Sequence, residues 1–195
     1  MKNRAITPTQ LEQRQSLSNA RLGMVLFIAA EMMLFAGLIA GYVVLRFGSG
    51  NFEGMDRLPV GLTGISTALL IGSSIALVIG GRDLRRGAGG GFKRSALIAL
   101  LLGIGFLLLQ VVEWNHLIDA GVSPDINVYG GMFYALSWVH GAHVLGGIVL
   151  LAILAIRAFG NRFSPTRRNF VVVASIYWHF VTLVWLGLFV ILFLV

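Results

Sequence analysis

Residues 170–195 read FVVVASIYWHFVTLVWLGLFVILFLV and contain no Asp, Glu, Lys or Arg. Since an α-helix rises about 1.5 Å per residue, a run of this length crosses the roughly 30 Å hydrocarbon core of a membrane. Apolar and polar residues do not alternate along the run, as they would in a membrane-spanning strand. We therefore expect residues 170–195 to form a transmembrane helix.

Four further apolar runs precede this one, at residues 23–45, 59–81, 95–114 and 131–156. The five runs together predict an all-α integral membrane protein with five transmembrane helices. The composition agrees, because only 12% of the residues are charged, against about 25% in a soluble domain. We therefore exclude a soluble globular fold, and divide the chain into an N-terminal segment, 1–22, and a five-helix transmembrane domain, 23–195.

Charge alternates between the segments that connect the apolar runs. Residues 1–22, 82–94 and 157–168 have net charges of +3, +4 and +4, whereas 46–57 are neutral and 119–125 carry −2. By the positive-inside rule, the N-terminus lies in the cytoplasm and the C-terminus outside. Because the basic residues then face anionic headgroups at one membrane surface, we expect no nucleic-acid partner.

Small residues recur at a spacing of four in several runs and predict close contacts between helices. They are Gly37 and Gly41; Gly72, Ala76 and Gly80; Ser95, Ala99 and Gly103; and Ala142 and Gly146. Between the second and third runs, the glycine-rich residues 87–91 predict a flexible linker.

Ionisable residues inside an apolar run are costly in a membrane, so each is a candidate functional residue. Glu31 lies well inside the first run. It either handles a proton or binds a partner, or it hydrogen-bonds to a neighbouring helix. Gln110, Glu113 and His116 form a row on one helix face at the end of the third run. We interpret this row as a partly solvated polar end near the outer interface, in preference to a ligand site.

Three histidines, His140, His143 and His179, lie near the middle of the last two runs. Two histidines on separate helices could ligate one haem iron, as in a membrane electron carrier. The alternative is that neighbouring helices satisfy these side chains as neutral imidazoles. The chain has no Cys, which excludes thiolate metal sites, iron–sulfur clusters and disulfides.

Four motifs, one in each of the first, third, fourth and fifth runs, point to one family. They are GMVLFIAAE at 23–31, QVVEW at 110–114, HGAHV at 140–144 and SIYWHFVTLVW at 175–185. Together they resemble subunit III of the haem–copper terminal oxidases, a family that includes the cytochrome c and quinol oxidases. The chain resembles the short, five-helix form of this subunit.

The resemblance implies an accessory subunit without a redox centre, in the cytoplasmic inner membrane of a prokaryote. Its partners would be the catalytic subunit I, which holds the haems and copper, subunit II and further small subunits. The first two helices would pack against the last three as a V-shaped bundle with structural phospholipids in the cleft. A related nitric oxide reductase accessory subunit, a bis-His haem carrier and a transporter are the alternative functions.

We expect buried polar or proton-related roles for Glu31, Gln110, Glu113, His140, His143, His179 and Thr182. The family commonly has Asp where this chain has Thr182. Lipid or interface anchors are expected at Trp114, Trp138, Trp178, Trp185, Arg167 and Arg168. We expect no catalytic residue, metal ligand or cofactor on this chain, since haem and copper would belong to the partner subunit.

Overall fold

The computed structural model describes residues 8–48, 60–125, 128–160 and 169–194, and every regular element within them is helical. The elements are α1 (Pro8–Gly48), α2 (Val60–Arg85), α3 (Gly89–Asp119), α4 (Val128–Phe159), α5 (Asn169–Phe189) and the π-helical turn η2 (Val190–Leu194). Each of the five long helices contains a stretch long and apolar enough to cross a membrane. The prediction of an all-α protein with five spans is confirmed.

The helices extend beyond most of the ends of the apolar runs. Helix α1 already begins at Pro8, so residues 8–22 continue without a break into the first span. Helix α3 likewise covers both Gly89 and Asp119. Hydropathy locates the part of a helix in the hydrocarbon core, whereas the helical backbone continues into the headgroup region.

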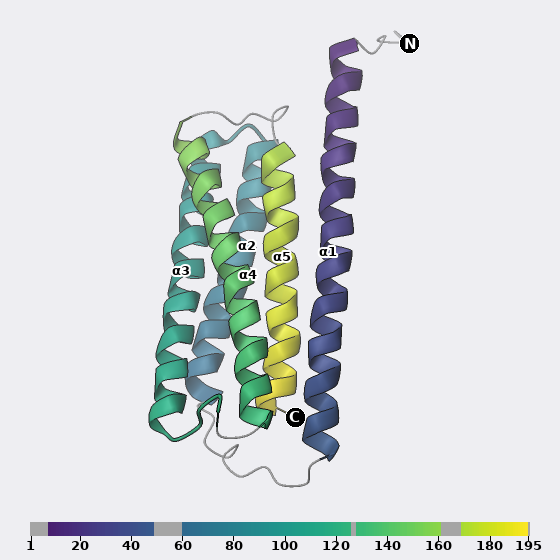
Figure 1. Cartoon of the computed structure of the whole chain (residues 1–195). Helices are drawn as coiled ribbons and strands as arrows, with labels where there is room; N and C mark the ends of the chain where they lie inside the picture. The colour runs from purple at the N-terminus through teal and green to yellow at the C-terminus, as the bar shows by residue number, and fades with distance from the viewer. Residues whose placement is uncertain (1–7, 49–59, 126–127, 161–168, 195) are drawn as a thin grey trace.

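Helices α2, α3, α4 and α5 form a closed ring of contacts, and α1 packs on its outside against α4 and α5 (Figure 1). The expected grouping of two helices against three is therefore wrong. Within the described residues, α1 and α2 share no extensive contact. The physical reason is that α2 packs its small residues against α3, whereas Phe35 of α1 packs on His143 of α4 and Gly41 of α1 lies against Met132 of α4.

The core lies inside the ring of α2–α5. Leu70, Phe106, Trp178 and Trp185 are fully buried there. In the apolar stretch of α1, by contrast, only 6% is buried inside the protein, compared with 44% in that of α5. Helix α1 is thus a peripheral helix that exposes most of its apolar side chains.

Glycine ends α2 and α3 with tight turns. Gly87 has φ +80°, and the N–H of Ala88 donates to the carbonyl of Asp83 at 2.9 Å. This is the Schellman pattern, which requires a left-handed residue. Gly121 has φ +84° and ends α3 in the same way. The prediction of a flexible linker at 87–91 is wrong, because Gly87 closes α2 and Gly89 already belongs to α3.

The small residues of α2 and α3 allow these helices to approach closely, as predicted. A Cβ atom added at Gly80 would lie 2.8 Å from the Cβ of Ser95. The hydroxyl of Ser73 donates to the carbonyl of Ala99 at 2.7 Å. Other small residues do not share this role, since a Cβ at Gly37 would meet nothing within 4 Å.

Helices α1 and α5 begin, and α2 and α4 end, at the same end of the bundle (Figure 1). Basic side chains lie at this end, which we call the basic end. Arg21 of α1 and Arg85 of α2 line one pocket there. Arg157, at the end of α4, lies 4.8 Å from the ring centroid of Phe170 in α5. This arrangement agrees with the charge pattern from which we predicted a cytoplasmic N-terminus.

Candidate functional site

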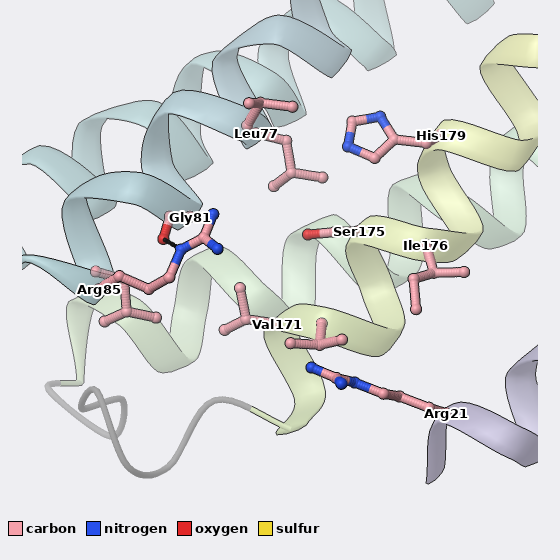
Figure 2. A pocket seen from close by; sticks show the side chains of 11 residues that line it. Arg21, Leu77, Gly81, Arg85, Val171, Ser175, Ile176 and His179 are labelled. Carbon is pink, nitrogen blue, oxygen red and sulfur yellow. Dashed lines mark hydrogen bonds between the residues drawn. The ribbon is translucent and has the colours of Figure 1, made fainter. Parts of the chain in front are cut away.

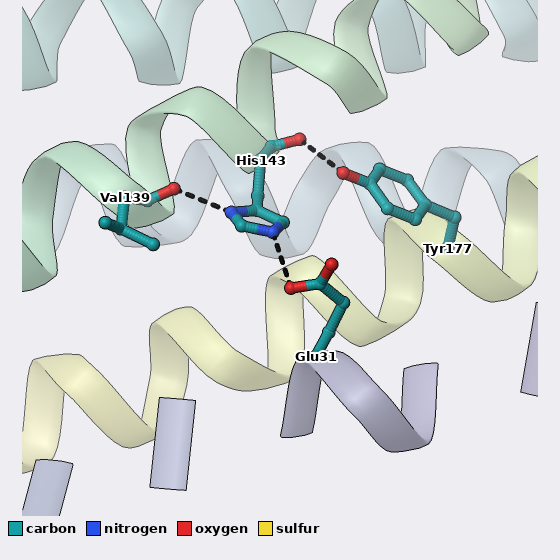
Figure 3. Close-up of polar contacts among 4 residues, drawn as sticks. All are labelled: Glu31, Val139, His143 and Tyr177. Carbon is teal, nitrogen blue, oxygen red and sulfur yellow. Dashed lines mark hydrogen bonds and ion pairs between the residues drawn. The ribbon is translucent and has the colours of Figure 1, made fainter. Parts of the chain in front are cut away.

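The first polar contact of interest joins α1 to α4 (Figure 3). Oε2 of Glu31 lies 2.9 Å from Nε2 of His143, and each side chain is 17% exposed. Nδ1 of His143 lies 2.7 Å from the carbonyl oxygen of Val139. Since a carbonyl oxygen only accepts, Nδ1 carries a proton and donates. The Glu31–His143 contact therefore holds one further proton, either on the carboxyl group or on Nε2.

Aromatic rings surround this contact. The ring of Phe35 lies 5.1 Å from that of His143, and the ring of Phe27 lies 6.2 Å from that of Tyr177. The Tyr177 hydroxyl donates to the carbonyl of His143 at 2.9 Å (Figure 3). Glu31 thus finds its partner within this chain, on a helix that is 112 residues away in sequence.

A second polar group lies inside the ring of α2–α5. Glu113 is 0% exposed and accepts hydrogen bonds from the Thr63 hydroxyl and from Nε2 of Gln110, the latter at 3.3 Å. The interpretation of Gln110 and Glu113 as a partly solvated end is wrong, because Thr63 of α2 covers the carboxyl group and supplies a donor. His116, which was expected to continue the row, is exposed.

The Glu113 contacts continue along α2. The hydroxyl of Thr67 donates to the carbonyl of Thr63 at 2.7 Å, and Nε1 of Trp185 donates to the Thr67 hydroxyl at 2.9 Å. Trp185 also stacks on His140, with ring centroids 5.1 Å apart. Hydrogen bonds and one stacked pair thereby connect residues of all four helices of the ring.

A third polar contact joins α2 to α5 closer to the basic end. The hydroxyl groups of Ser74 and Thr182 lie 2.9 Å apart, and Nδ1 of His179 lies 3.2 Å from the Ser74 oxygen. The Thr182 hydroxyl also lies 2.9 Å from the carbonyl of Trp178. Thr182 thus bonds across the α2–α5 interface with its hydroxyl group.

The three histidines do not converge on one site. His143 contacts Glu31, His179 contacts Ser74, and His140 is enclosed by the rings of Phe35, Phe106 and Trp185. Aromatic side chains occupy the space around the His140 ring where a porphyrin would have to lie, so these residues do not fit a bis-His haem. Within the described residues, no three side chains of His, Asp or Glu are grouped to hold a metal ion.

A pocket of about 290 Å³ opens between α1, α2 and α5 at the basic end (Figure 2). Arg21 and Arg85 line it together with Ser175 and His179, and Leu77 and Val171 contribute apolar walls. Nε of Arg85 donates to the carbonyl of Gly81 at 3.1 Å. Cationic, hydroxyl and apolar groups thus line one concave surface.

The expected lipid anchors fall into three groups. Trp178 and Trp185 are 0% exposed, so the prediction that they contact lipid or the interface is wrong; both rings fill the space between helices. Trp138 is 48% exposed and Trp114 is partly buried, so both remain candidates. Arg167 and Arg168 lie outside the described residues.

Several residues of these contacts were not predicted. Thr63, Thr67 and Ser74 share one face of α2, and their spacing of four and seven residues is a signal that the sequence contains. Tyr177 lies inside the SIYWHFVTLVW motif, but its hydroxyl partner is a backbone carbonyl, which has no sequence signal. The pocket at Arg21 and Arg85 depends on how α1 packs and could not be inferred locally.

Five membrane-spanning helices whose buried polar side chains bond mainly across helix interfaces define a multi-pass helical membrane protein. Its family follows from comparison with known proteins. The family model described as cytochrome c oxidase subunit III matches residues 12–195. The chain therefore belongs to the cytochrome c oxidase subunit III family, and the resemblance found in its motifs is confirmed.

Curated relatives cover most of the chain. The cytochrome c oxidase subunit 3 of Corynebacterium diphtheriae is 35% identical over 178 residues, which cover 89% of this chain and 87% of the relative. A probable cytochrome c oxidase subunit 3 of Nocardia farcinica is 36% identical over 176 residues, with the same coverage. The cytochrome bo(3) ubiquinol oxidase subunit 3 of Pseudomonas putida is 30% identical over 177 residues, covering 89% of this chain and 84% of the relative.

Membership of this family makes the chain a subunit of a haem–copper oxidase complex and so a component of respiratory electron transport. A subunit of such a complex has catalytic subunits as partners. The five spans make it a multi-pass membrane protein. The comparisons lend no support to a nitric oxide reductase subunit or a haem carrier.

Proposed function

We propose that this chain is a non-redox accessory subunit III that stabilises the catalytic subunit of its oxidase, in the inner membrane of a prokaryote with the N-terminus in the cytoplasm. The observation that carries the proposal is the family match over residues 12–195. The polar contacts support it, because Glu31, Glu113 and Thr182 each bond to another helix of this chain. Side chains paired in this way hold helices together.

The haem and copper of the complex would lie in catalytic subunit I, with subunit II and further small subunits beside it. The surroundings of His140 support this distribution, since packed aromatic rings enclose it. Oxygen reduction would then occur on the neighbouring subunit. In this arrangement the chain contributes packing, bound lipid and, through Glu31, support for proton uptake by its neighbour.

The pocket at the basic end is the proposed lipid site of this subunit. Arg21 and Arg85 would pair with a headgroup phosphate, and Ser175 would hydrogen-bond to the polar part of the lipid near the interface. The acyl chains would lie along apolar walls such as Leu77 and Val171. This proposed lipid site lies between α1 on one side and α2 and α5 on the other. It is therefore not the expected cleft between the first two helices and the last three.

The experiment that tests the function is purification of the native complex through a tag on this chain. We expect a haem–copper catalytic subunit to co-purify in equal amount, and the chain dissociated from it to show no Soret band. A nitric oxide reductase core in the purified complex would contradict the oxidase assignment. A stoichiometric Soret band of the separated chain, lost in His140→Ala, would instead identify a haem carrier.

A further inference from the structure

Six buried side-chain polar atoms have no hydrogen-bond partner among the residues that the structure describes; two are the ring nitrogens of Trp114 and Trp178, and the other four belong to three side chains of α3 and α4. These four are Oε1 of Gln110, Oγ of Ser137, and Nδ1 and Nε2 of His140. The three side chains are 2%, 1% and 1% exposed. Buried polar atoms in proteins almost always bond to protein or to ordered water, so each of the four needs a partner.

The three side chains lie at neighbouring levels of the bundle. Ser137 and His140 are three residues apart and therefore share one face of α4. The ring of His140 lies 6.3 Å from that of Phe106 in α3. Helices α3 and α4 run in opposite directions (Figure 1), so Gln110, one turn beyond Phe106 on α3, lies at the level of the Ser137–His140 turn of α4.

The other sides of this region already consist of bonded groups. Trp185 stacks on His140 and donates its N–H to Thr67. From Thr67, hydrogen bonds lead through Thr63 to Glu113, which accepts from Nε2 of Gln110. These contacts therefore connect His140 to Gln110 by way of Trp185, Thr67, Thr63 and Glu113. On the remaining side lie the atoms of Gln110, Ser137 and His140 that lack partners.

We propose that an internal water site lies between Gln110, Ser137 and His140 and closes this circuit of hydrogen bonds. The chemistry fits water, which both donates and accepts. The amide oxygen of Gln110 only accepts, the hydroxyl of Ser137 does both, and a neutral imidazole has one donor and one acceptor nitrogen. Buried waters in proteins make about three bonds to groups of this kind.

A metal ion does not fit the same place. Both oxygens of Glu113 already accept hydrogen bonds, from Thr63 and from Gln110, and so are held away from a ligand role. The remaining donors are one amide oxygen, one hydroxyl and one imidazole, and they provide no negative charge to balance a cation. Water carries no charge and avoids this cost in the membrane interior.

The site makes Glu113 and His140 parts of one network that includes α2, α3, α4 and α5. This goes beyond the accessory role, because it predicts a hydrated interior in a bundle whose outer surface is apolar. Helix α1 borders it through the ring of Phe35, which lies 6.3 Å from that of His140. The water would stabilise the four-helix ring independently of the Glu31–His143 contact.

The direct test is a cryo-EM map of the intact oxidase complex at a resolution that shows ordered water. We expect density for water within hydrogen-bond distance of the Ser137 hydroxyl in the wild type, and no such density in His140→Phe. A wild-type map that shows ordered water elsewhere at this depth but none beside Ser137 would overturn the proposal. The wild-type map decides the question even if the variants do not assemble.

A double-mutant cycle tests the same site by the half-life of the complex at elevated temperature. We expect Ser137→Ala and His140→Phe each to shorten the half-life severalfold, and the double variant to shorten it no further than the stronger single one, because both disrupt the same water. If the double variant shortens the half-life by the product of the two single factors, the two side chains act independently and the proposal is refuted. A longer half-life in His140→Phe than in the wild type would likewise show a dry site and refute it.

Ser73→Ala is the matched control for this cycle. Ser73 is also buried in a helix interface, but its hydroxyl has a direct partner in the carbonyl of Ala99. We expect the Ser73→Ala/His140→Phe double variant to shorten the half-life by the product of the two single-variant factors. If the control also fails to multiply, the half-life is limited by a step outside this site, and the map alone then decides.

Discussion

Glu31 and His143 are the one pair of ionisable side chains in the described part of the chain that bonds across a helix interface with both groups partly accessible. The pair provides α1 with a specific partner on α4, whereas most apolar side chains of α1 are exposed. In a membrane, apolar packing between helices has little preference over packing with lipid. The Glu31–His143 contact therefore helps to fix the position of α1 on the bundle.

Replacing Glu31 tests how much the oxidase needs the carboxyl group. We expect Glu31→Gln to keep substantial turnover and normal assembly, because an amide can still bond to Nε2 of His143. Glu31→Ala leaves that nitrogen without its partner, at a cost of about 1–3 kcal/mol. It should reduce the amount of this chain that co-purifies with the catalytic subunit and hasten the loss of activity during sustained turnover.

Oxygen consumption and its decay measure the first effect, and the ratio of subunits measures the second. Met33→Ala is the control on the same helix, since Met33 is 77% exposed. Immediate loss of all turnover in a fully assembled Glu31→Gln complex would show that the carboxyl takes part in the chemistry, contrary to the accessory role.

Trp178 illustrates how a single residue fixes the spacing of three helices. Its ring lies between Gly103 of α3 and Gly147 of α4, and a Cβ added at Gly147 would lie 2.6 Å from the ring. A rigid, fully buried indole cannot move aside. We expect Gly147→Ala to destabilise the subunit by about 1–3 kcal/mol through overpacking.

Thermal unfolding of the complex, followed by loss of this subunit, measures the Gly147 effect. Gly187→Ala is the matched control, because a Cβ at Gly187 would meet nothing within 4 Å. Since Ala favours helix over Gly, this control should unfold at the same or a higher temperature. Equal behaviour of the two variants would mean that Trp178 is not confined as described.

Small residues bring α2 and α3 into close contact. A Cβ at Gly80 would lie 2.8 Å from the Cβ of Ser95, and a Cβ next to the backbone cannot rotate away. We expect Gly80→Ala to push the helices apart, break the Ser73–Ala99 hydrogen bond and lower the unfolding temperature of the subunit. The neighbouring Gly81→Ala should not, since a Cβ there would meet nothing within 4 Å.

These helices also show how far the sequence predicts structure. Hydropathy predicts all five spans because burial in lipid depends on local composition. It does not predict that residues 87–91 hold a tight turn, because the same glycines suit a linker and a Schellman cap. Nor does it predict the partner of each helix, so α1 was grouped with α2 although it packs on α4 and α5.

The same limit applies to the candidate site. Placing an ionisable side chain inside a membrane costs free energy, so the sequence alone identifies Glu31, Glu113 and His140 as unusual residues. Their partners come from distant helices, however, and Thr63 changes Glu113 from a solvated end into a buried, bonded carboxyl. The sequence likewise predicts aromatic anchors in general, but only packing separates buried Trp185 from exposed Trp138.

At the scale of the whole molecule, the two ends differ in charge, and this predicts orientation. The chain contains no Cys, so single cysteines can be introduced as labels without a prior deletion. Ala88 in the α2–α3 turn and Ala120 after α3 are both exposed and lie at opposite ends of α3. With an impermeant maleimide on intact spheroplasts, we expect Ala120→Cys to react and Ala88→Cys to react only after the membrane is opened. The reverse pattern would place the N-terminus outside.

The basic pocket predicts a further property of the whole complex. We expect Arg21→Ala with Arg85→Ala to lose a phospholipid that remains bound to the purified wild-type complex, as measured by native mass spectrometry. Arg86→Ala is the control, because Arg86 is exposed at the same end but does not line the pocket. Delipidation that removes no bound lipid and leaves stability unchanged would contradict a lipid site.

The separation of 112 residues between Glu31 and His143 also bears on how the protein is made. A ribosome adds roughly 5–20 residues per second, so Glu31 emerges about 6–22 s before its partner. During this interval α1 is already in the membrane or its insertion machinery, while α4 has not been synthesised. Glu31 therefore spends this interval without its α4 partner, and the Glu31–His143 bond can form only after α4 has been inserted.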